Sequence, residues 1–228
     1  MKRWIKWTAG IVGTAAVLAV AVAAVGWQMA GRKQARKVAV PVQPVAYLGD
    51  AQALERGKYL FESRGCVDCH GANGAGRVFV EDGKGLRIAG PNITSGGVTA
   101  RYQPQDWVRT IRHGVKPGGQ PLMVMPSEDY NRFTNQDLAS LVAYVRSLPP
   151  QQGGAAVVEL PFPVRVLYGL GAIKDAAAKI DHSLPPAQPV PVAVDARHGA
   201  YVANMCIGCH GEHLSGGKIP GGPPDWPP

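Results

Sequence analysis

The sequence predicts an all-α protein with long loops and an N-terminal transmembrane helix. Three observations support this prediction. An apolar stretch covers residues 8–29, and amphipathic patterns of helical period cover residues 52–64 and 134–148. Glycine (29) and proline (20) are abundant among the 228 residues, whereas aromatic residues make up 7%. This composition favours short helices joined by shaped loops over a large sheet or a helical bundle.

The first expected element is a membrane anchor within residues 1–37. Thr8–Met29 is apolar apart from threonines, glycines and Gln28; as a helix it would extend about 33 Å, enough to cross a bilayer. Indole side chains favour the membrane interface, and three of them flank the stretch: Trp4, Trp7 and Trp27. A cleaved signal peptide is the alternative, because Ala21-Val22-Ala23 is a passable cleavage site. The apolar stretch is longer than the usual signal core, which favours a retained anchor.

The net charge of +8 comes from the flanks of this anchor. Residues 1–37 contain seven basic residues and no acidic residue. The basic residues are Lys2, Arg3, Lys6, Arg32, Lys33, Arg36 and Lys37. The remaining 17 basic and 16 acidic residues nearly cancel, so the charge gives no reason to expect nucleic-acid binding. Three basic residues precede the apolar stretch and four follow it, so charge does not decide its orientation.

Residues 38–50 are expected to form an extended tether, and residues 51–150 a compact domain. The expected elements of this domain are a helix at 52–64, a loop-rich stretch at 71–105, a short helix at 106–113 and a stronger helix from 134. Thr134 and Asp137 resemble a capping box at the start of that last helix. Pro149-Pro150 ends it.

Residues 151–190 are expected to be a linker rich in proline and glycine, with one helical stretch at 167–180. The pattern of the domain then starts again. Gly57-Lys58-Tyr59 before Cys66 is echoed by Gly199-Ala200-Tyr201 before Cys206. This internal repeat indicates a second, related domain that begins within residues 191–228.

All four cysteines lie in two copies of one motif. The copies are Cys66-Val67-Asp68-Cys69-His70 and Cys206-Ile207-Gly208-Cys209-His210. Cys-x-x-Cys-His is the attachment signature of c-type haem. Two thiols at this spacing on a helical turn can each form a thioether to one vinyl group of the porphyrin, and the adjacent imidazole is then held beneath the ring. The sequence therefore predicts two haem c groups, with His70 and His210 as iron ligands.

The cysteine pairs have three other possible interpretations. A thioredoxin-like redox couple belongs near a βαβ pattern, and none is visible. A zinc site could combine the pairs with His70 and His210, but the separation of Cys69 and Cys206 matches no common zinc finger. Plain disulfides remain open in an oxidising compartment. The use of every cysteine in the same haem motif favours haem over all three.

Residues 50–150 resemble the class I cytochromes c. Gly90-Pro91-Asn92-Ile93-Thr94 is similar to the Gly-Pro-Asn-Leu loop of that family, which implies that the Pro91 carbonyl accepts a hydrogen bond from His70. Met125-Pro126 resembles the family's distal methionine, which implies Met125 as the second iron ligand. Three residues resemble those at which the family's first and last helices cross: Gly57, Phe61 and Tyr144.

Met123 competes with Met125 for the iron of the first haem. The two sulfurs would face opposite ways in an extended segment, because the residues are two positions apart. Core packing is the structural alternative for either one. His113 is expected to be a loop or helix-end residue.

The second copy lacks the rest of the domain. Only 18 residues follow His210, and none is a methionine. Met205 adjoins Cys206 on the attachment side, and His213 is too close to reach the opposite face. His198 and His182 are formal distal ligands. The preferred explanation is that the sequence is a fragment, with the second domain truncated.

The arrangement also resembles multi-haem cytochrome subunits of membrane-bound periplasmic dehydrogenases, such as those for alcohols or gluconate. This resemblance implies an electron carrier rather than an enzyme, in the bacterial inner membrane with its haem domains in the periplasm. It would receive electrons from a dehydrogenase and pass them to quinone, another cytochrome or a terminal oxidase. The alternative is a haem enzyme of peroxidase or thiosulfate-oxidising type, with an open iron site at the second haem.

Overall fold

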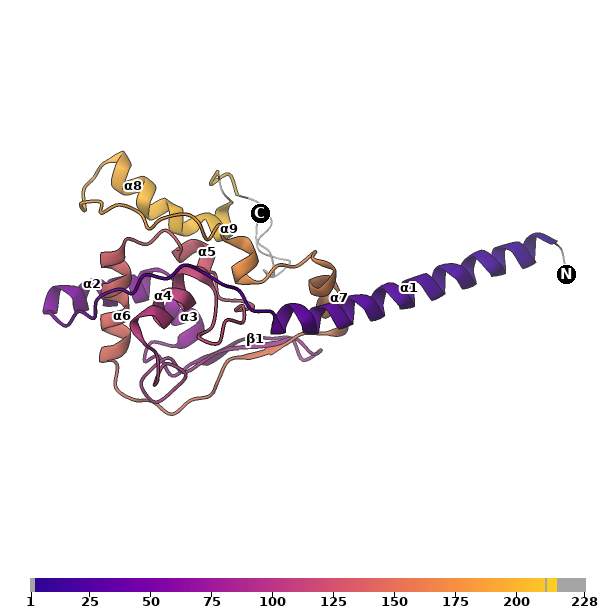
Figure 1. Ribbon diagram of the computed structural model, residues 1–228, viewed down its shortest axis with the longest axis horizontal. Coiled ribbons are helices and arrows are strands. Elements are labelled where there is room, and N and C mark those ends of the chain that lie inside the picture. Colours follow the sequence, from indigo (N-terminus) through magenta and orange to yellow (C-terminus); the bar gives the residue numbers. More distant parts are fainter. Residues whose placement is uncertain (1–2, 212, 217–228) are drawn as a thin grey trace.

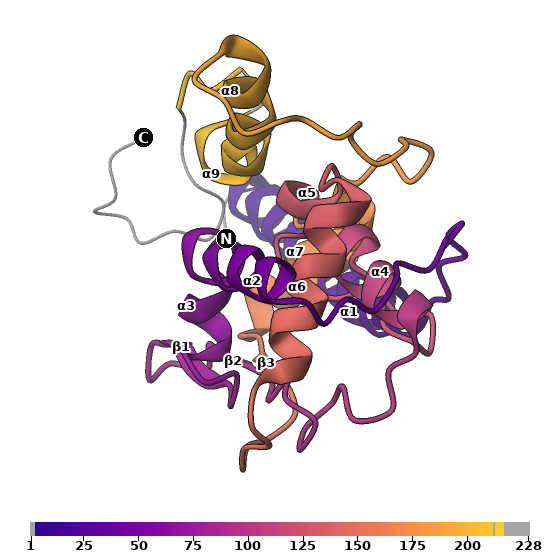
Figure 2. The same ribbon diagram turned by 90° about the vertical axis from the view of Figure 1, so that its left-hand side faces the viewer.

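The computed structural model describes residues 3–211 and 213–216, with only the backbone of residues 208 and 209. Helices dominate, which confirms the predicted fold class, and one small sheet is added. Figure 1 shows a long helix, α1, projecting from a body formed by the other elements. The last helices of the chain, α8 and α9, lie on one side of that body, where α9 contacts α5 (Figures 1 and 2).

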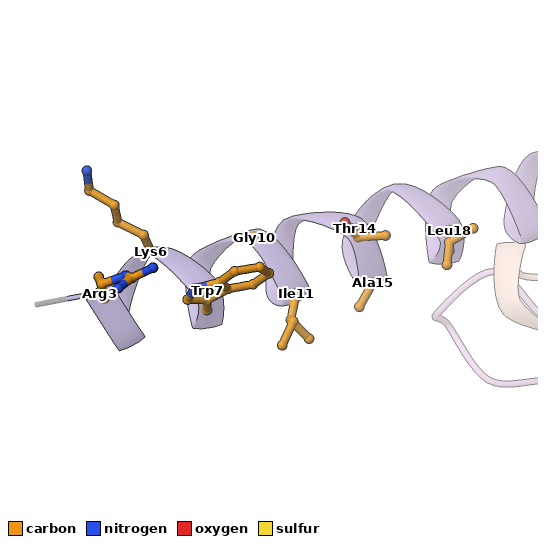
Figure 3. A pocket seen from close by; sticks show the side chains of 8 residues that line it. All are labelled: Arg3, Lys6, Trp7, Gly10, Ile11, Thr14, Ala15 and Leu18. Atoms are coloured by element: carbon orange, nitrogen blue, oxygen red, sulfur yellow. The ribbon is translucent and has the colours of Figure 1, made fainter.

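Helix α1 (Arg3–Ala35) is the candidate membrane anchor. Among the described residues it is the one helix long and apolar enough to cross a membrane. It extends beyond the predicted span at both ends, since the flanking lysines and arginines are good helix formers. Figure 3 shows the N-terminal part, where Arg3, Lys6 and Trp7 precede the apolar side chains of Ile11 and Leu18. Ile11 and Leu18 are exposed, as expected for side chains that face lipid.

Helices α2 (Ala51–Ser63) and α6 (Asn135–Ser147) form the centre of the body. The Asp50 carboxylate caps α2 by accepting from the Ala53 N–H at 2.9 Å. The Thr134 hydroxyl caps α6 by accepting from the Asp137 N–H at 3.0 Å, as the sequence predicted.

The two helices cross at Gly57. A Cβ atom there would collide with the Ser140 carbonyl, so the backbones touch only because the side chain is absent. One turn later the Phe61 and Tyr144 rings pack with centroids 5.5 Å apart. These are the positions that the family resemblance placed at the crossing.

Replacing Gly57 by alanine should therefore destabilise the protein strongly. We expect a loss of about 3 kcal/mol in the free energy of unfolding, because the methyl group forces the helices apart. Gly199→Ala is the matched control, since Gly199 holds the same place in the repeat with nothing within 4 Å of its Cβ position. Chemical denaturation of both variants in detergent measures the difference. Equal stability of the two variants would contradict the close crossing.

The three short strands form an antiparallel sheet in the order β1-β2-β3. The strands are β1 (Arg77–Glu81), β2 (Arg87–Gly90) and β3 (Val157–Glu159). The sequence predicted only loops at β1 and β2, and a linker at β3. The strands contain at most five residues each, too few for a clear alternation, and β3 pairs with β2 across a long separation in sequence.

The remaining elements surround this centre. They are α4 (Pro104–His113), α5 (Ser127–Tyr130), α7 (Phe162–Leu170), η1 (Ala176–Lys179), α8 (Ala196–Ala203), η2 (Asn204–Cys206) and α9 (Ile207–His210). The helical stretch predicted at 167–180 is divided into α7 and η1. It starts earlier because proline at 163 fits a first helical turn, and it breaks at Gly171, whose φ of 90° is left-handed.

The segment predicted as a tether has neither helix nor strand from residue 36 to residue 49. It nevertheless follows the domain closely. The Val38 N–H donates to the Gly119 carbonyl at 2.9 Å, and the Val45 side chain is buried in the core. The tether therefore contributes to the body as well as connecting it to α1.

Candidate haem-attachment sites

The first attachment motif forms a single helical turn, α3 (Cys66–His70). Glycines flank it on both sides, Gly65 with φ 74° and Gly71 with φ 73°. Such left-handed conformations are accessible to glycine at little cost, and they let the chain enter and leave one short turn sharply. Cys66 and Cys69 are partly buried on this turn, with free thiols.

The electrostatic surroundings of these thiols do not suit a redox couple. Burial raises the pKa of Cys66 to about 12, and burial also raises the pKa of Cys69. A thioredoxin-like pair needs a thiolate, and therefore a lowered pKa. The pair is better suited to a covalent bond with an apolar group.

The His70 ring is oriented by the loop that carries Pro91. Its Nδ1 atom lies 3.0 Å from the Pro91 carbonyl, the contact that the family resemblance implies. A carbonyl only accepts, so Nδ1 carries the proton and Nε2 keeps its lone pair for a metal. Burial lowers the pKa of His70, while the Pro91 carbonyl acts in the opposite direction. A Cβ atom at Gly90 would collide with the backbone of Cys69, so this loop lies directly on the motif.

Met125 and Met123 differ in their surroundings. Met125 is partly buried and packs against the main core cluster, which Cys66 and Val67 also contact. Met123 is partly buried but does not belong to the described members of that cluster. Met125-Pro126 leads directly into α5. Met125, and not Met123, therefore contacts the same core cluster as the attachment turn.

A haem group fits these residues. The core cluster that Cys66 and Met125 contact also contains Trp107, whose Nε1 atom is buried without an acceptor among the described residues. A buried N–H requires a partner, and a haem propionate is one of suitable chemistry. Zinc is less suitable, because the described residues contain no group of three histidine, cysteine or acidic side chains placed to hold a metal ion.

The second motif repeats the local backbone of the first. The Gly71 N–H donates to the Val67 carbonyl at 2.9 Å, and the Gly211 N–H donates to the Ile207 carbonyl at 2.8 Å. After each motif the chain turns back to the histidine carbonyl, which accepts from Gly76 at 2.8 Å in the first copy and from Gly216 at 2.9 Å in the second. Leu214 even adopts a positive φ of 55° where the first copy has Gly74, with φ 74°.

The side chains of the second motif are less enclosed. Cys206 and His210 are exposed, while Cys66 and His70 are partly buried. The side chain of Cys209 lies outside the described part of the chain. The Nδ1 atom of the formal distal ligand His198 lies 2.9 Å from the Ala193 carbonyl, a contact that does not involve its Nε2.

His182, the other formal ligand, pairs with His113. The two Nδ1 atoms lie 3.1 Å apart, and His182 Nε2 lies 3.1 Å from the Ala177 carbonyl. Both ring nitrogens of His182 are therefore engaged. His113 is the last residue of α4 and is buried, a helix-end residue as expected. The pairing was not predicted, because nothing in the sequence places residues 69 positions apart in contact.

The comparison with protein families decides the identity of the first domain. Residues 54–149 match the family model described as cytochrome c. These residues are a cytochrome c domain. Covalently bound haem c is therefore implied for this domain.

Curated relatives extend the similarity beyond the cytochrome c domain. The chain is 30% identical over 148 residues to the fructose dehydrogenase cytochrome subunit of Gluconobacter japonicus, covering 61% of this chain and 30% of the relative. It is 29% identical over 181 residues to the gluconate 2-dehydrogenase cytochrome c subunit of Pantoea cypripedii, covering 72% and 40%. A cbb3-type cytochrome c oxidase subunit of Helicobacter pylori is 31% identical over 113 residues, covering 50% and 34%. The chain thus spans well under half the length of each. The similarity is to electron-transfer subunits rather than to catalytic enzymes.

Hydrogen bonds from Tyr201 connect the helix before the second motif to the cytochrome c domain. The Tyr201 hydroxyl donates to the Asp137 carboxylate at 2.6 Å and accepts from the Thr134 N–H at 3.2 Å. Arg56 donates two further hydrogen bonds to Asp137, at 2.8 and 2.9 Å. Burial opposes the ionisation of Asp137, but the bonds from Arg56 and Tyr201 prevail and lower its pKa. This pairing therefore stabilises the fold above the ordinary aspartate pKa of about 4, and the stabilisation is lost as the pH falls through the lower, folded value.

Removing the Tyr201 hydroxyl should loosen the second motif. We expect Tyr201→Phe to increase amide hydrogen exchange in α8 by about tenfold, since a buried hydrogen bond to a charged group contributes about 1.5 kcal/mol or more. Tyr59→Phe is the control, because Tyr59 holds the same place in the first copy and is 49% exposed. Unchanged exchange in α8 would show that packing alone holds the segment.

Proposed function

We propose that the chain is a membrane-anchored electron carrier with two haem c groups, serving a dehydrogenase. The observation that carries this proposal is the repeated attachment turn. Both copies combine the Cys-x-x-Cys-His sequence with the same glycine-ended turn and the same return hydrogen bond to the histidine carbonyl. A matching backbone at both motifs supports two haem sites rather than one.

In the first site, thioethers from Cys66 and Cys69 would hold the porphyrin. His70 would bind the iron through Nε2, oriented by Pro91, and Met125 would bind from the other side. Haem c, when bound, supplies a one-electron couple. Ligation by histidine and methionine fills both axial positions, which favours electron transfer over the binding of small molecules.

In the second site, Cys206 and Cys209 would form the thioethers and His210 would bind the iron. The position of helix α5 supports electron exchange between the two haem sites. Its residue Tyr130 donates to the Arg64 carbonyl at 2.7 Å, immediately before the first attachment turn, and α5 also contacts α9.

The proposed location is the periplasmic face of the bacterial inner membrane. Haem c is attached outside the cytoplasmic membrane, so the domains would lie there and the N-terminus of α1 inside. The proposed donor is a dehydrogenase, in keeping with the relatives that are named as subunits of fructose and gluconate dehydrogenases. The proposed acceptors are quinone, another cytochrome or a terminal oxidase.

The test is to mix the purified full chain, in liposomes, with such a dehydrogenase and its substrate. We expect rapid appearance of the reduced haem spectrum, and an intact mass that exceeds the polypeptide by two haems. Heat-inactivated dehydrogenase is the control. If dithionite reduced the haem fully but neither fructose dehydrogenase nor gluconate dehydrogenase reduced it, the proposed donor would be overturned. A mass increase of one haem would overturn the second site.

A further inference from the structure

Helix α7 packs closely on the last third of α1. Gly169 faces α1 so closely that a Cβ atom there would collide with the Gly26 carbonyl. The Phe162 ring stacks on the Trp27 ring with centroids 5.5 Å apart. The Arg165 guanidinium lies 3.9 Å from the centroid of the same indole. Small residues and stacked rings therefore join the two helices without a gap.

The depth of this contact follows from the length of α1. The apolar stretch Thr8–Met29 is about 33 Å long as a helix and so matches the hydrocarbon core of a bilayer. Gly26 and Trp27 belong to its C-terminal end, where Trp27 marks the membrane interface. Whatever packs against these residues lies at the same depth, which for α7 is the boundary between hydrocarbon and headgroups.

The outer surface of α7 is apolar and open. Phe162 is 54% exposed, and Leu167 and Leu170 are each 45% exposed. Phe162 stacks on the exposed Trp27, and Leu170 lies beside Gly26, so these side chains adjoin the exposed apolar residues of α1. The one charged residue of α7 is Arg165, which is turned onto Trp27. A helix with this surface is suited to the headgroup boundary of a membrane.

Contacts on both sides of α7 join it to the cytochrome c domain. Before it, β3 pairs with β2. After it, the buried Asp175 links α7 to the start of the tether, since it accepts from Arg36 at 2.5 and 2.7 Å and from the Tyr168 hydroxyl of α7 at 2.9 Å. The Ala176 N–H then donates to the Leu122 carbonyl at 2.9 Å. A fixed depth of α7 would therefore fix the domain relative to the membrane.

We propose that α7 is a second membrane contact, which lies in the outer headgroup layer against α1 with Phe162, Leu167 and Leu170 facing lipid. This inference rests on the proposed role of α1 as an anchor. We assign lipid as the partner of α7 because the apolar surface of α7 adjoins the surface that α1 itself presents to the bilayer.

Hydroxyl-radical footprinting of the haem-loaded full chain tests this proposal. The protein is placed in liposomes of phosphatidylethanolamine and phosphatidylglycerol, and leucine oxidation is compared between sites. Leu184 is the matched control, since it is also 45% exposed but lies outside α7 and α1. We expect Leu167 and Leu170 to react at least tenfold more slowly than Leu184. Leu18, within α1, reports the anchor independently.

The outcomes separate the two proposals. Protection of Leu18 with Leu167 reacting as fast as Leu184 overturns the contact by α7 and leaves the anchor intact. Reaction of all three at similar rates overturns the anchor and the inference together. A lipid with a photoreactive headgroup should also label the α7 peptide. Protection of Leu167 without such labelling would show that a second copy of the chain covers α7, and would overturn the assignment to lipid.

Discussion

The double variant Cys66→Ala/Cys69→Ala is expected to lose the haem of the first domain completely. Both thiols lie on the α3 turn, whereas Cys206 belongs to the second motif. The cytochrome c domain should also lose its stable fold, since the core cluster that Cys66 and Met125 contact would be left without the porphyrin as its apolar partner. We expect the intact mass to fall by one haem, with a cooperative unfolding transition no longer detectable.

The matched control for this experiment is Cys206→Ala/Cys209→Ala. It removes the same two sulfurs from the second motif, whose Cys206 is exposed rather than packed in the core. We expect it also to lose one haem, but to keep the unfolding transition of the first domain. If the Cys66→Ala/Cys69→Ala variant retained its full haem content and mass, covalent attachment at this turn would be excluded.

The sequence predicted the elements whose signals are local. The cap at Thr134 depends on residues a few positions apart, and the structure has it. The attachment turns are equally local, since two cysteines and a histidine occupy five consecutive residues. Patterns of this kind can be recognised without knowing the rest of the fold. The crossing at Gly57 joins two helices that are distant in sequence, and only the family resemblance placed it there.

The features that were missed depend on contacts between distant segments. Strand β3 has three residues and takes its identity from pairing with β2, so its own sequence carries too little alternation to predict it. The bonds from Tyr201 to Asp137 and from Arg36 to Asp175 join residues 64 and 139 positions apart. A single sequence gives no information on such pairs. They convert the predicted linker and tether into packed parts of the body.

The choice between Met125 and Met123 gives the second large prediction. We expect Met125→Ala to convert the first haem from a low-spin form to one that binds carbon monoxide readily, because removing the thioether opens one axial position. Met125 packs with the cluster that contains Cys66, while Met123 does not, so Met123→Ala should leave the spectrum and carbon monoxide binding unchanged. The two variants delete the same side chain two residues apart, which makes each a control for the other.

Absorbance spectra of the reduced protein, with and without carbon monoxide, measure this effect. A second haem would contribute to the same spectra, so both variants are best made in the Cys206→Ala/Cys209→Ala background. The helical circular dichroism signal distinguishes loss of an iron ligand from global unfolding. Met125→Ala should largely retain this signal, because Met125 lies in a loop outside the crossing of α2 and α6. If Met123→Ala opened the site and Met125→Ala did not, the distal ligand would be Met123, and the segment before α5 would have to rearrange when haem binds.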